Sequence, residues 1–201
     1  MNDMDIVVAS NNKHKIVEIE TFLKKYLPDA RVLSLSDIGY DKDIVENGKT
    51  FEENALIKAK TIAKLGYIAV ADDSGLEVDA LGGKPGVYSA RYAGEPCDDR
   101  KNNKKLLAAM DGLYGDERSA RFVSVIAGVF PDGRQVTARG ECPGEMLTVY
   151  RGNGGFGYDP LFYYAPMGKT FAEMTAEEKN QISHRARAMA AFAEKFSKEF
   201  K

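Results

Sequence analysis

The sequence predicts an α/β fold, and three observations lead to that class. Short apolar runs typical of buried strands occur at 6–9 and 67–71, each beside a segment with helical spacing of apolar residues. A strand–turn–strand pattern follows at 121–138. The chain has 201 residues, a length that suits one domain with a substantial core, and we expect that domain to have two lobes.

Composition narrows the function classes. The formal net charge of -2 provides no general basic field, so we expect no nucleic-acid partner. The longest apolar run, 122–130, is too short to span a bilayer, so we expect no membrane partner. Cys97 and Cys142 lack metal-site spacing and are expected to be free thiols. The first residues lack the basic region of a signal peptide, which together with the thiols favours a cytoplasmic setting.

The first strand, Ile6–Ala9, leads into a polar loop and then a helix. Apolar residues recur at helical spacing from Ile16 to Leu27, and Pro28 marks the end of this helix. The helix N-terminus, with Lys13 and Lys15 beside it, suits an anion such as phosphate. A solvated, lysine-rich turn is the alternative.

A second strand is predicted at 31–35, followed by a polar loop at 36–49 that contains Glu46. Thr50 and Glu53 have the spacing of a capping box, which predicts a helix from there to Gly66. Lysines on such a helix are usually solvated, and this is the alternative to a binding role for Lys58.

The third strand, predicted at 67–71, is followed at once by Asp72, Asp73, Ser74 and Gly75. In open α/β sheets, ligands bind beyond the carboxyl ends of the strands. Two carboxylates placed there suit a divalent cation or the removal of a proton from water. The same residue types also favour a simple turn, which is the alternative.

The middle of the chain predicts a glycine-rich turn at 82–86, a helix at 99–110 and a hairpin. The hairpin pairs 121–130 with 135–138 through Pro131-Asp132-Gly133, and a further strand is expected within 145–150.

A second glycine-rich segment, Gly152–Gly157, formally matches the G-x-G-x-x-G pattern of dinucleotide-binding folds. That pattern requires a helix directly after the glycines, whereas the following residues are expected to be extended, because Pro160 disfavours helix at Asp159. A loop that approaches a flat ligand fits this segment better.

The last segment predicts one long helix. Thr175 and Glu178 form a second capping box, and apolar residues from Ile182 to Phe200 follow one face. Basic side chains gather near its first turns, and a solvated basic face is the alternative to a binding role.

Six segments, in this order, resemble the inosine/xanthosine triphosphate pyrophosphatases, a family that removes deaminated purine nucleotides from the nucleotide pool. The resemblance covers nearly the whole chain and rests on Ser10–Lys15, Phe51–Ala55, Ala71–Leu76, Gly82–Tyr92, Gly154–Pro160, and Glu177–Lys179 with Ile182–Arg185. It implies an α/β fold with a long twisted mixed β-sheet flanked by helices, and two lobes with an active-site cleft between them. It also implies a homodimer, Mg²⁺ as cofactor, and hydrolysis of a nucleoside triphosphate to the monophosphate and pyrophosphate.

The resemblance also implies roles for particular residues. Glu46 and Asp73 match the metal-binding carboxylates, and Asp73, with Asp72 in support, matches the base that activates water. The positions that match substrate contacts are Ser10, Asn11, Asn12, Lys13, His14, Lys15, Lys58, Ser74, Arg91, Phe156, Gly157, Tyr158, Asp159, Lys179, His184 and Arg185.

These residue types fit the implied chemistry. A triphosphate repels a nucleophile, and carboxylates that hold Mg²⁺ beside it offset this charge. Hypoxanthine and xanthine have an oxygen where adenine has an amino group, so donors near His184 and Arg185 would favour the former. Phe156 is expected to stack on the purine.

Other activities fit less well. A pyrophosphatase for other nucleotides would keep the carboxylates but need a different base pocket. A non-catalytic nucleotide-binding regulator predicts the loss of a metal carboxylate, whereas Glu46, Asp72 and Asp73 are all present. A P-loop NTPase is excluded because its G-x-x-x-x-G-K-[ST] motif is absent from the sequence.

Overall fold

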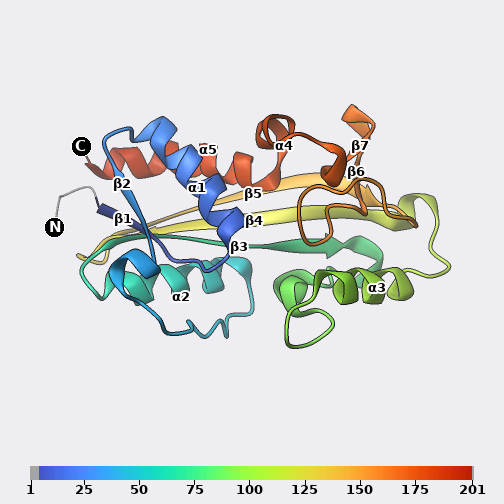
Figure 1. The fold of residues 1–201 in the computed structure, drawn as a ribbon, viewed down its shortest axis with the longest axis horizontal. Helices are drawn as coiled ribbons and strands as arrows, with labels where there is room; N and C mark the ends of the chain where they lie inside the picture. Colours follow the sequence, from blue (N-terminus) through green and yellow to red (C-terminus); the bar gives the residue numbers. More distant parts are fainter. Residues whose placement is uncertain (1–4, 201) are drawn as a thin grey trace. The chain divides into compact units, whose positions relative to one another are not determined.

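A computed structural model describes residues 5–200, with the side chain of residue 200 left out. Seven strands form one sheet in the order β2-β1-β3-β4-β5-β6-β7 (Figure 1). Their bounds are β1 (Asp5–Val8), β2 (Arg31–Ser34), β3 (Ile68–Val78), β4 (Ser119–Val129), β5 (Gln135–Met146), β6 (Phe162–Tyr164) and β7 (Lys169–Thr170). β1 pairs in parallel with β2 and β3, whereas β6 pairs antiparallel with β5 and β7. The α/β class and the mixed sheet are therefore confirmed.

The chain divides into two compact units. The first contains the described residues within 1–73, 124–140 and 186–201, and the second contains 74–123 and 141–185. β3, β4 and β5 each contribute residues to both units. The expectation of an active-site cleft between two lobes stays a prediction.

The first unit contains α1 (Lys13–Tyr26), α2 (Phe51–Ala63) and most of α5 (His184–Phe196). Figure 1 shows α1 and α5 on one face of its strands and α2 on the other. Leu23 of α1 and Phe192 of α5 belong to the same buried cluster as Ile6 and Val70 of the strands. This packing holds the loop after β1 and the middle of β3 in place.

The helix starts follow from local sequence. The Asn12 side chain caps α1 by accepting from the backbone N–H groups of His14 and Lys15. Thr50 caps α2 by accepting from Glu53 N–H, at 3.1 Å. The Glu53 carboxylate accepts from Lys49 N–H rather than completing the predicted capping box. Both helices begin close to the predicted positions.

The second unit is built around α3 (Asp99–Ala109) and the far halves of β3, β4 and β5. Leu106 of α3 is buried with Leu76 of β3, Phe122 of β4 and Phe162 of β6. The predicted hairpin is confirmed, because Phe130 N–H donates to Arg134 C=O across the turn. The two short strands predicted near 135–138 and 145–150 are one strand, β5.

The third predicted strand was too short. It was expected to end at Ala71, but β3 continues to Val78, so Asp72 and Asp73 lie inside the strand and not beyond its end. Buried Leu76 and Val78 extend the strand beyond the carboxylates. The two carboxylates can be buried within the strand because each has an ammonium group within 3.0 Å.

The single C-terminal helix was also a wrong prediction. Ser183 is extended, with ψ 156°, and it separates α4 (Ala176–Ile182) from α5. The capping box of Thr175 and Glu178 at the start of α4 is confirmed. Within residues 5–200, no helix combines the length and apolar character needed to cross a membrane. Cys97 and Cys142 are free thiols, as expected.

Candidate active site

The first unit contains a cluster of three charged groups, two buried and one partly exposed. Asp73 comes from β3, Lys58 from α2 and Glu46 from the loop before α2. Lys58 Nζ lies 2.8 Å from Glu46 Oε2 and 3.0 Å from Asp73 Oδ1. Lys58 and Asp73 are each 7% exposed. Lys58 is therefore not a solvated helix lysine, and it brings the two predicted metal carboxylates together.

The cluster shifts the pKa values of its members. Burial raises the pKa of Asp73 to about 6, although the charges of Lys58 and Lys15 act in the opposite direction. Burial also acts to raise the pKa of Glu46, but the charge of Lys58 and its hydrogen bond hold that pKa below the usual value. Glu46 is thus ionised at neutral pH. Asp73 gains or loses its proton at a pH only slightly below neutral.

One oxygen of Asp73 is available for further chemistry. Asp73 Oδ2 is buried and accepts no hydrogen bond from the described residues. A buried carboxylate oxygen without a donor is costly, so its position indicates a cation or a proton donor that arrives with a ligand. Within residues 5–200, no three acidic, histidine or cysteine side chains form a metal-binding group. Glu46 and Asp73 would therefore provide only part of a metal's coordination.

The loop that carries Glu46 is held by an asparagine that sequence reasoning missed. Asn54 is buried on α2, and its Oδ1 accepts from Gly48 N–H at 2.8 Å. A Cβ at Gly48 would lie 2.6 Å from that same oxygen, so only glycine fits. In the sequence, the one signal for this role is a polar asparagine among the apolar residues of the first helical turns.

Asp72 belongs to a second group of contacts. Successive side chains of a strand point to opposite faces, so Asp72 and Asp73 diverge. Asp72 Oδ2 lies 2.8 Å from Lys15 Nζ, and Asp72 Oδ1 accepts from Ser124 Oγ at 2.5 Å. The structure thus connects the loop after β1 to β3 through Lys15. Ser124, on β4, is a contact that the sequence did not reveal.

The rest of the predicted triphosphate loop surrounds the start of α1. Ser10 Oγ accepts from Asn12 N–H at 3.2 Å, so the turn is ordered by its own side chains. Asn11, Lys13 and His14 are exposed, which leaves this surface accessible to a ligand.

The second unit contains a different cluster, built around Asp159. Lys179 Nζ of α4 lies 2.7 Å from Asp159 Oδ2, and the same oxygen accepts from Phe156 N–H at 3.0 Å. Lys179 Nζ also lies 5.0 Å from the Phe156 ring centroid and 5.3 Å from that of Phe171. Both charged groups are buried. A Cβ at Gly155 would overlap Asp159 Oδ2, so the glycine permits this close approach.

His184 and Arg185, at the start of α5, are buried in the second unit. The His184 ring stacks on Phe122, with centroids 4.8 Å apart and planes at 15°. Arg185 is 1% exposed and donates from Nη2 to Ser74 Oγ at 3.0 Å. Two predicted substrate contacts, Ser74 and Arg185, are thereby brought together.

The remaining predicted residues differ in their surroundings. The Tyr158 hydroxyl donates to Ser89 C=O at 2.7 Å, and burial raises the pKa of Tyr158. This tyrosine therefore anchors the loop from inside. Arg91 lies in a 3-10 helix, Gly86–Arg91, with its guanidinium 5.4 Å from the Tyr88 ring centroid.

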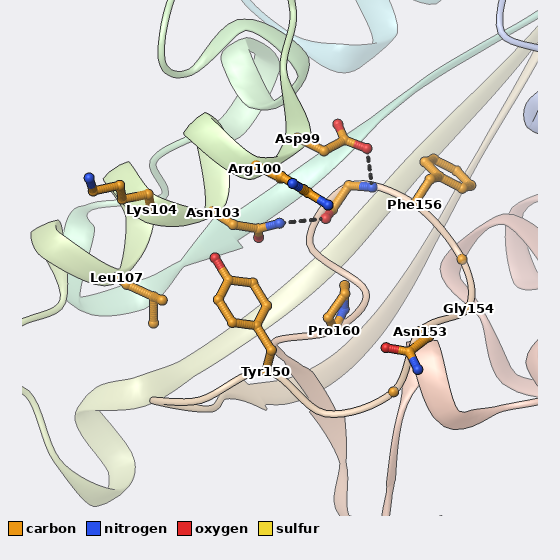
Figure 2. Close-up of a pocket in the computed structure, with 13 residues that line it drawn as sticks. Asp99, Arg100, Asn103, Lys104, Leu107, Tyr150, Asn153, Gly154, Phe156 and Pro160 are labelled. Atoms are coloured by element: carbon orange, nitrogen blue, oxygen red, sulfur yellow. Dashed lines mark hydrogen bonds between the residues drawn. The ribbon is translucent and has the colours of Figure 1, made fainter.

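A pocket borders the glycine-rich loop on the side of α3 (Figure 2). Its volume is about 720 Å³, and its lining includes Asn103, Leu107, Tyr150 and Phe156. The backbone of Gly157 is hydrogen-bonded to Asp99 and Asn103 of α3. Neither of these two residues was singled out from the sequence, because their partner lies more than 50 residues away along the chain.

Comparisons with known proteins agree with this arrangement of segments. The chain is 50% identical over 190 residues to a protein from Clostridium perfringens named dITP/XTP pyrophosphatase, which covers 91% of this chain and 92% of that protein. The solved structure of the Staphylococcus aureus Ham1 protein has 43% identity and a TM-score of 0.87, covering 97% of this chain and 99% of that one.

A nucleoside-triphosphatase / dITP/XTP pyrophosphatase from Mycobacterium abscessus has 43% identity and a TM-score of 0.78, covering 94% of this chain and 97% of that one. The model of the Ham1 family matches residues 6–195, which include every predicted site residue. On this evidence, the chain belongs to the Ham1 family.

Proposed function

We propose that this chain is a dITP/XTP pyrophosphatase, which hydrolyses ITP, dITP and XTP to the monophosphate and pyrophosphate and so removes them from the nucleotide pool. The observation that carries the proposal is the cluster of Glu46, Lys58 and Asp73, in which one buried Asp73 oxygen accepts no hydrogen bond from residues 5–200. The 50% identity to a protein of that name supports it over nearly the whole chain.

Mg²⁺ is the cofactor that suits Glu46 and Asp73. Carboxylate oxygens are its preferred ligands, and Mg²⁺ in such enzymes is held by one or two carboxylates together with water and substrate phosphates. The buried Asp73 Oδ2 without a donor fits this requirement. When bound, the ion offsets the charge of the triphosphate and orients its phosphates.

Asp73 acts as the base in the proposed reaction. It takes a proton from a water molecule as the water oxygen bonds to the α-phosphorus and the bond to the bridging oxygen breaks, so pyrophosphate leaves. Burial raises the pKa of Asp73 to about 6 before Mg²⁺ binds, so at neutral pH the carboxylate is ionised and can accept the proton. Lys58 keeps Glu46 and Asp73 within reach of each other despite their like charges.

Lys15, Lys13 and the start of α1 would hold the triphosphate. Lys15 pairs with Asp72 at 2.8 Å, so Asp72 supports the reaction by keeping this lysine beside β3. Lys13 is exposed at the helix N-terminus, where the helix dipole also favours phosphate. Ser10, Asn11, Asn12 and His14 complete this loop.

The second unit would bind the purine. Phe156 is the proposed stacking partner, held by Asp159 and Lys179 through the contacts described above. Donors of the His184–Arg185 segment would satisfy the oxygen of hypoxanthine or xanthine and disfavour the amino group of adenine. One mismatched buried contact costs roughly 1–3 kcal/mol, so strong rejection of ATP requires several.

We further propose that the chain forms one two-lobed domain and assembles as a homodimer. The likeness to family members supports both, and exposed Val149 and Tyr150 provide apolar surface for a partner copy. Light scattering of the purified protein should give twice the mass of one chain, whereas the mass of a single chain would exclude the dimer.

Product analysis tests the proposed reaction. The purified chain is incubated with Mg²⁺ and, separately, with inosine, xanthosine, adenosine, guanosine and uridine triphosphates, and pyrophosphate is resolved from orthophosphate. Rapid pyrophosphate release from inosine and xanthosine triphosphates alone is expected. Release from another nucleotide would overturn the base assignment, and orthophosphate as first product would overturn attack at the α-phosphorus.

A further inference from the structure

Two side chains of α3 hold the backbone of one residue in the glycine-rich loop, Gly157. Gly157 N–H donates to Asp99 Oδ2 at 2.7 Å, and Gly157 C=O accepts from Asn103 Nδ2 at 2.8 Å (Figure 2). Asp99 and Asn103 lie four residues apart, so they share one face of the helix. We call this pair of hydrogen bonds the Gly157 clamp.

The loop is restrained mainly through its backbone, which lies against Ala172 at Gly152 and Gly154. Four of the six residues in 152–157 are glycines with no side chain to pack, and the loop borders the pocket of about 720 Å³. Gly157 has φ 62°, a left-handed conformation that glycine adopts without strain. Near Gly157, the hydrogen bonds from α3 therefore help to fix where this loop lies.

The clamp acts directly on the proposed base contact. Phe156 precedes Gly157, and its own N–H donates to Asp159 Oδ2 at 3.0 Å. Its backbone is thus held by Asp159 on one side and by α3 on the other. In Figure 2 the Phe156 ring extends away from Asn103 and Lys104, so α3 holds the backbone and not the ring.

Burial makes the Asn103 contact strong and specific. Asn103 is 4% exposed, so its amide exchanges few hydrogen bonds with water. Removing it leaves Gly157 C=O without its donor. An unsatisfied carbonyl gains by moving toward water, and the bordering pocket gives the loop room to move.

We propose that Asp99 and Asn103 are positioning residues that set Phe156 for the purine and thereby determine base affinity and selectivity. This inference rests on the proposed function of the same site. It separates two kinds of binding energy, because the hydrogen bonds of the clamp go to the loop proposed for the base, whereas the residues proposed to bind phosphate belong to the first unit.

Calorimetric binding of inosine monophosphate and of pyrophosphate, each with Mg²⁺, tests the inference. Asn103→Ala should weaken binding of inosine monophosphate about tenfold while pyrophosphate affinity stays within about twofold. Asp99→Ala should act in the same direction. Asp99→Asn keeps an acceptor oxygen for Gly157 N–H, so its affinity for inosine monophosphate should be close to that of wild type. If Asp99→Ala acted only by destabilising the protein, Asp99→Asn would not be expected to keep the affinity.

Leu107→Ala is the matched control, because Leu107 lies on the same helix and lines the same pocket without bonding to the loop. It should leave inosine monophosphate affinity within about twofold of wild type. The inference is overturned if Asn103→Ala binds inosine monophosphate normally, or if it loses affinity for both ligands equally. If Asn103→Ala does not fold, the Asp99→Ala and Asp99→Asn pair decides by the same criteria.

Failure of the proposed function gives a different result. A wild-type protein that releases no pyrophosphate from inosine triphosphate would overturn the function itself. A wild-type protein that does so, combined with variants that bind inosine monophosphate normally, would overturn only the clamp. The ratio of kcat/KM for inosine over adenosine triphosphate should also fall in Asn103→Ala.

Discussion

The carboxylate cluster of the first unit and the Asp159 cluster of the second both bury charged side chains, but they balance charge differently. In the first unit, the ammonium group of Lys58 lies within 3.0 Å of two carboxylates, Glu46 and Asp73. In the second, Asp159 and Lys179 form a pair that a backbone N–H and two aromatic rings complete.

The difference explains their different chemistry. A carboxylate that shares one ammonium group with a second carboxylate either takes up a proton or attracts a cation, and burial raises the pKa of Asp73 to about 6. The pair of Asp159 and Lys179 needs no added proton or cation to balance its charges. It holds Phe156 in place. Unbalanced charge thus marks the proposed reaction centre, and balanced charge marks the proposed base site.

Asp73→Asn should have the largest effect, because it changes the reaction centre and not the base site. The amide cannot take the proton from water, so kcat should fall about 10²- to 10⁴-fold while the fold is kept. Steady-state kinetics with inosine triphosphate and circular dichroism measure the two effects. Exposed Asp29→Asn is the control, and near-normal turnover in Asp73→Asn would exclude the proposed base.

Glu46→Gln should have the second largest effect, because it weakens metal binding. Loss of one carboxylate ligand should raise the Mg²⁺ concentration for half-maximal activity roughly 10- to 100-fold. A magnesium titration measures this shift, with exposed Glu52→Gln as the control on the same segment. Removal of the metal with a chelator should abolish activity in wild type, and unchanged activity would contradict a metal at Glu46.

Phe156→Ala should affect the base site alone. Loss of a stacked ring costs about 1–3 kcal/mol, so KM for inosine triphosphate should rise roughly 5- to 100-fold with little change in kcat. Phe156→Tyr keeps a ring and should remain close to wild type. An unchanged KM in the alanine variant would remove Phe156 from the proposed base site.

The smallest effect concerns stability in the absence of metal. The pKa of Asp73 rises from 3.8 to about 6 on folding, so the folded protein binds the proton more tightly than the unfolded chain. Stability should therefore fall as pH rises from about 4 to 6, and the loss should be complete above that range. Relative to wild type, Asp73→Asn should be more stable at pH 8 by roughly 1–3 kcal/mol.

Urea denaturation of the chelator-treated proteins at pH 4 and pH 8 measures this difference. The gain in Asp73→Asn should be present at pH 8 and nearly absent at pH 4. Equal stability of the two proteins at pH 8 would show that burying the ionised Asp73 carboxylate does not cost the folded protein free energy.

Much of this protein was determined by local sequence. Thr50 predicted the start of its helix because its side chain accepts from an N–H group only three residues away. The hairpin at 121–138 and the rejected dinucleotide motif also follow from local turn chemistry. The family was evident from six ordered segments, and the match over residues 6–195 agrees with it.

Only the tertiary structure decided which charges meet and where elements end. β3 runs through Asp72 and Asp73 because Lys15 and Lys58, distant in sequence, offset their burial. Lys58 could be assigned as a solvated lysine until β3 and the Glu46 loop were placed beside it. The contacts of Ser124 with Asp72 and of Asn103 with Gly157 span more than 50 residues, and local patterns cannot encode such partners.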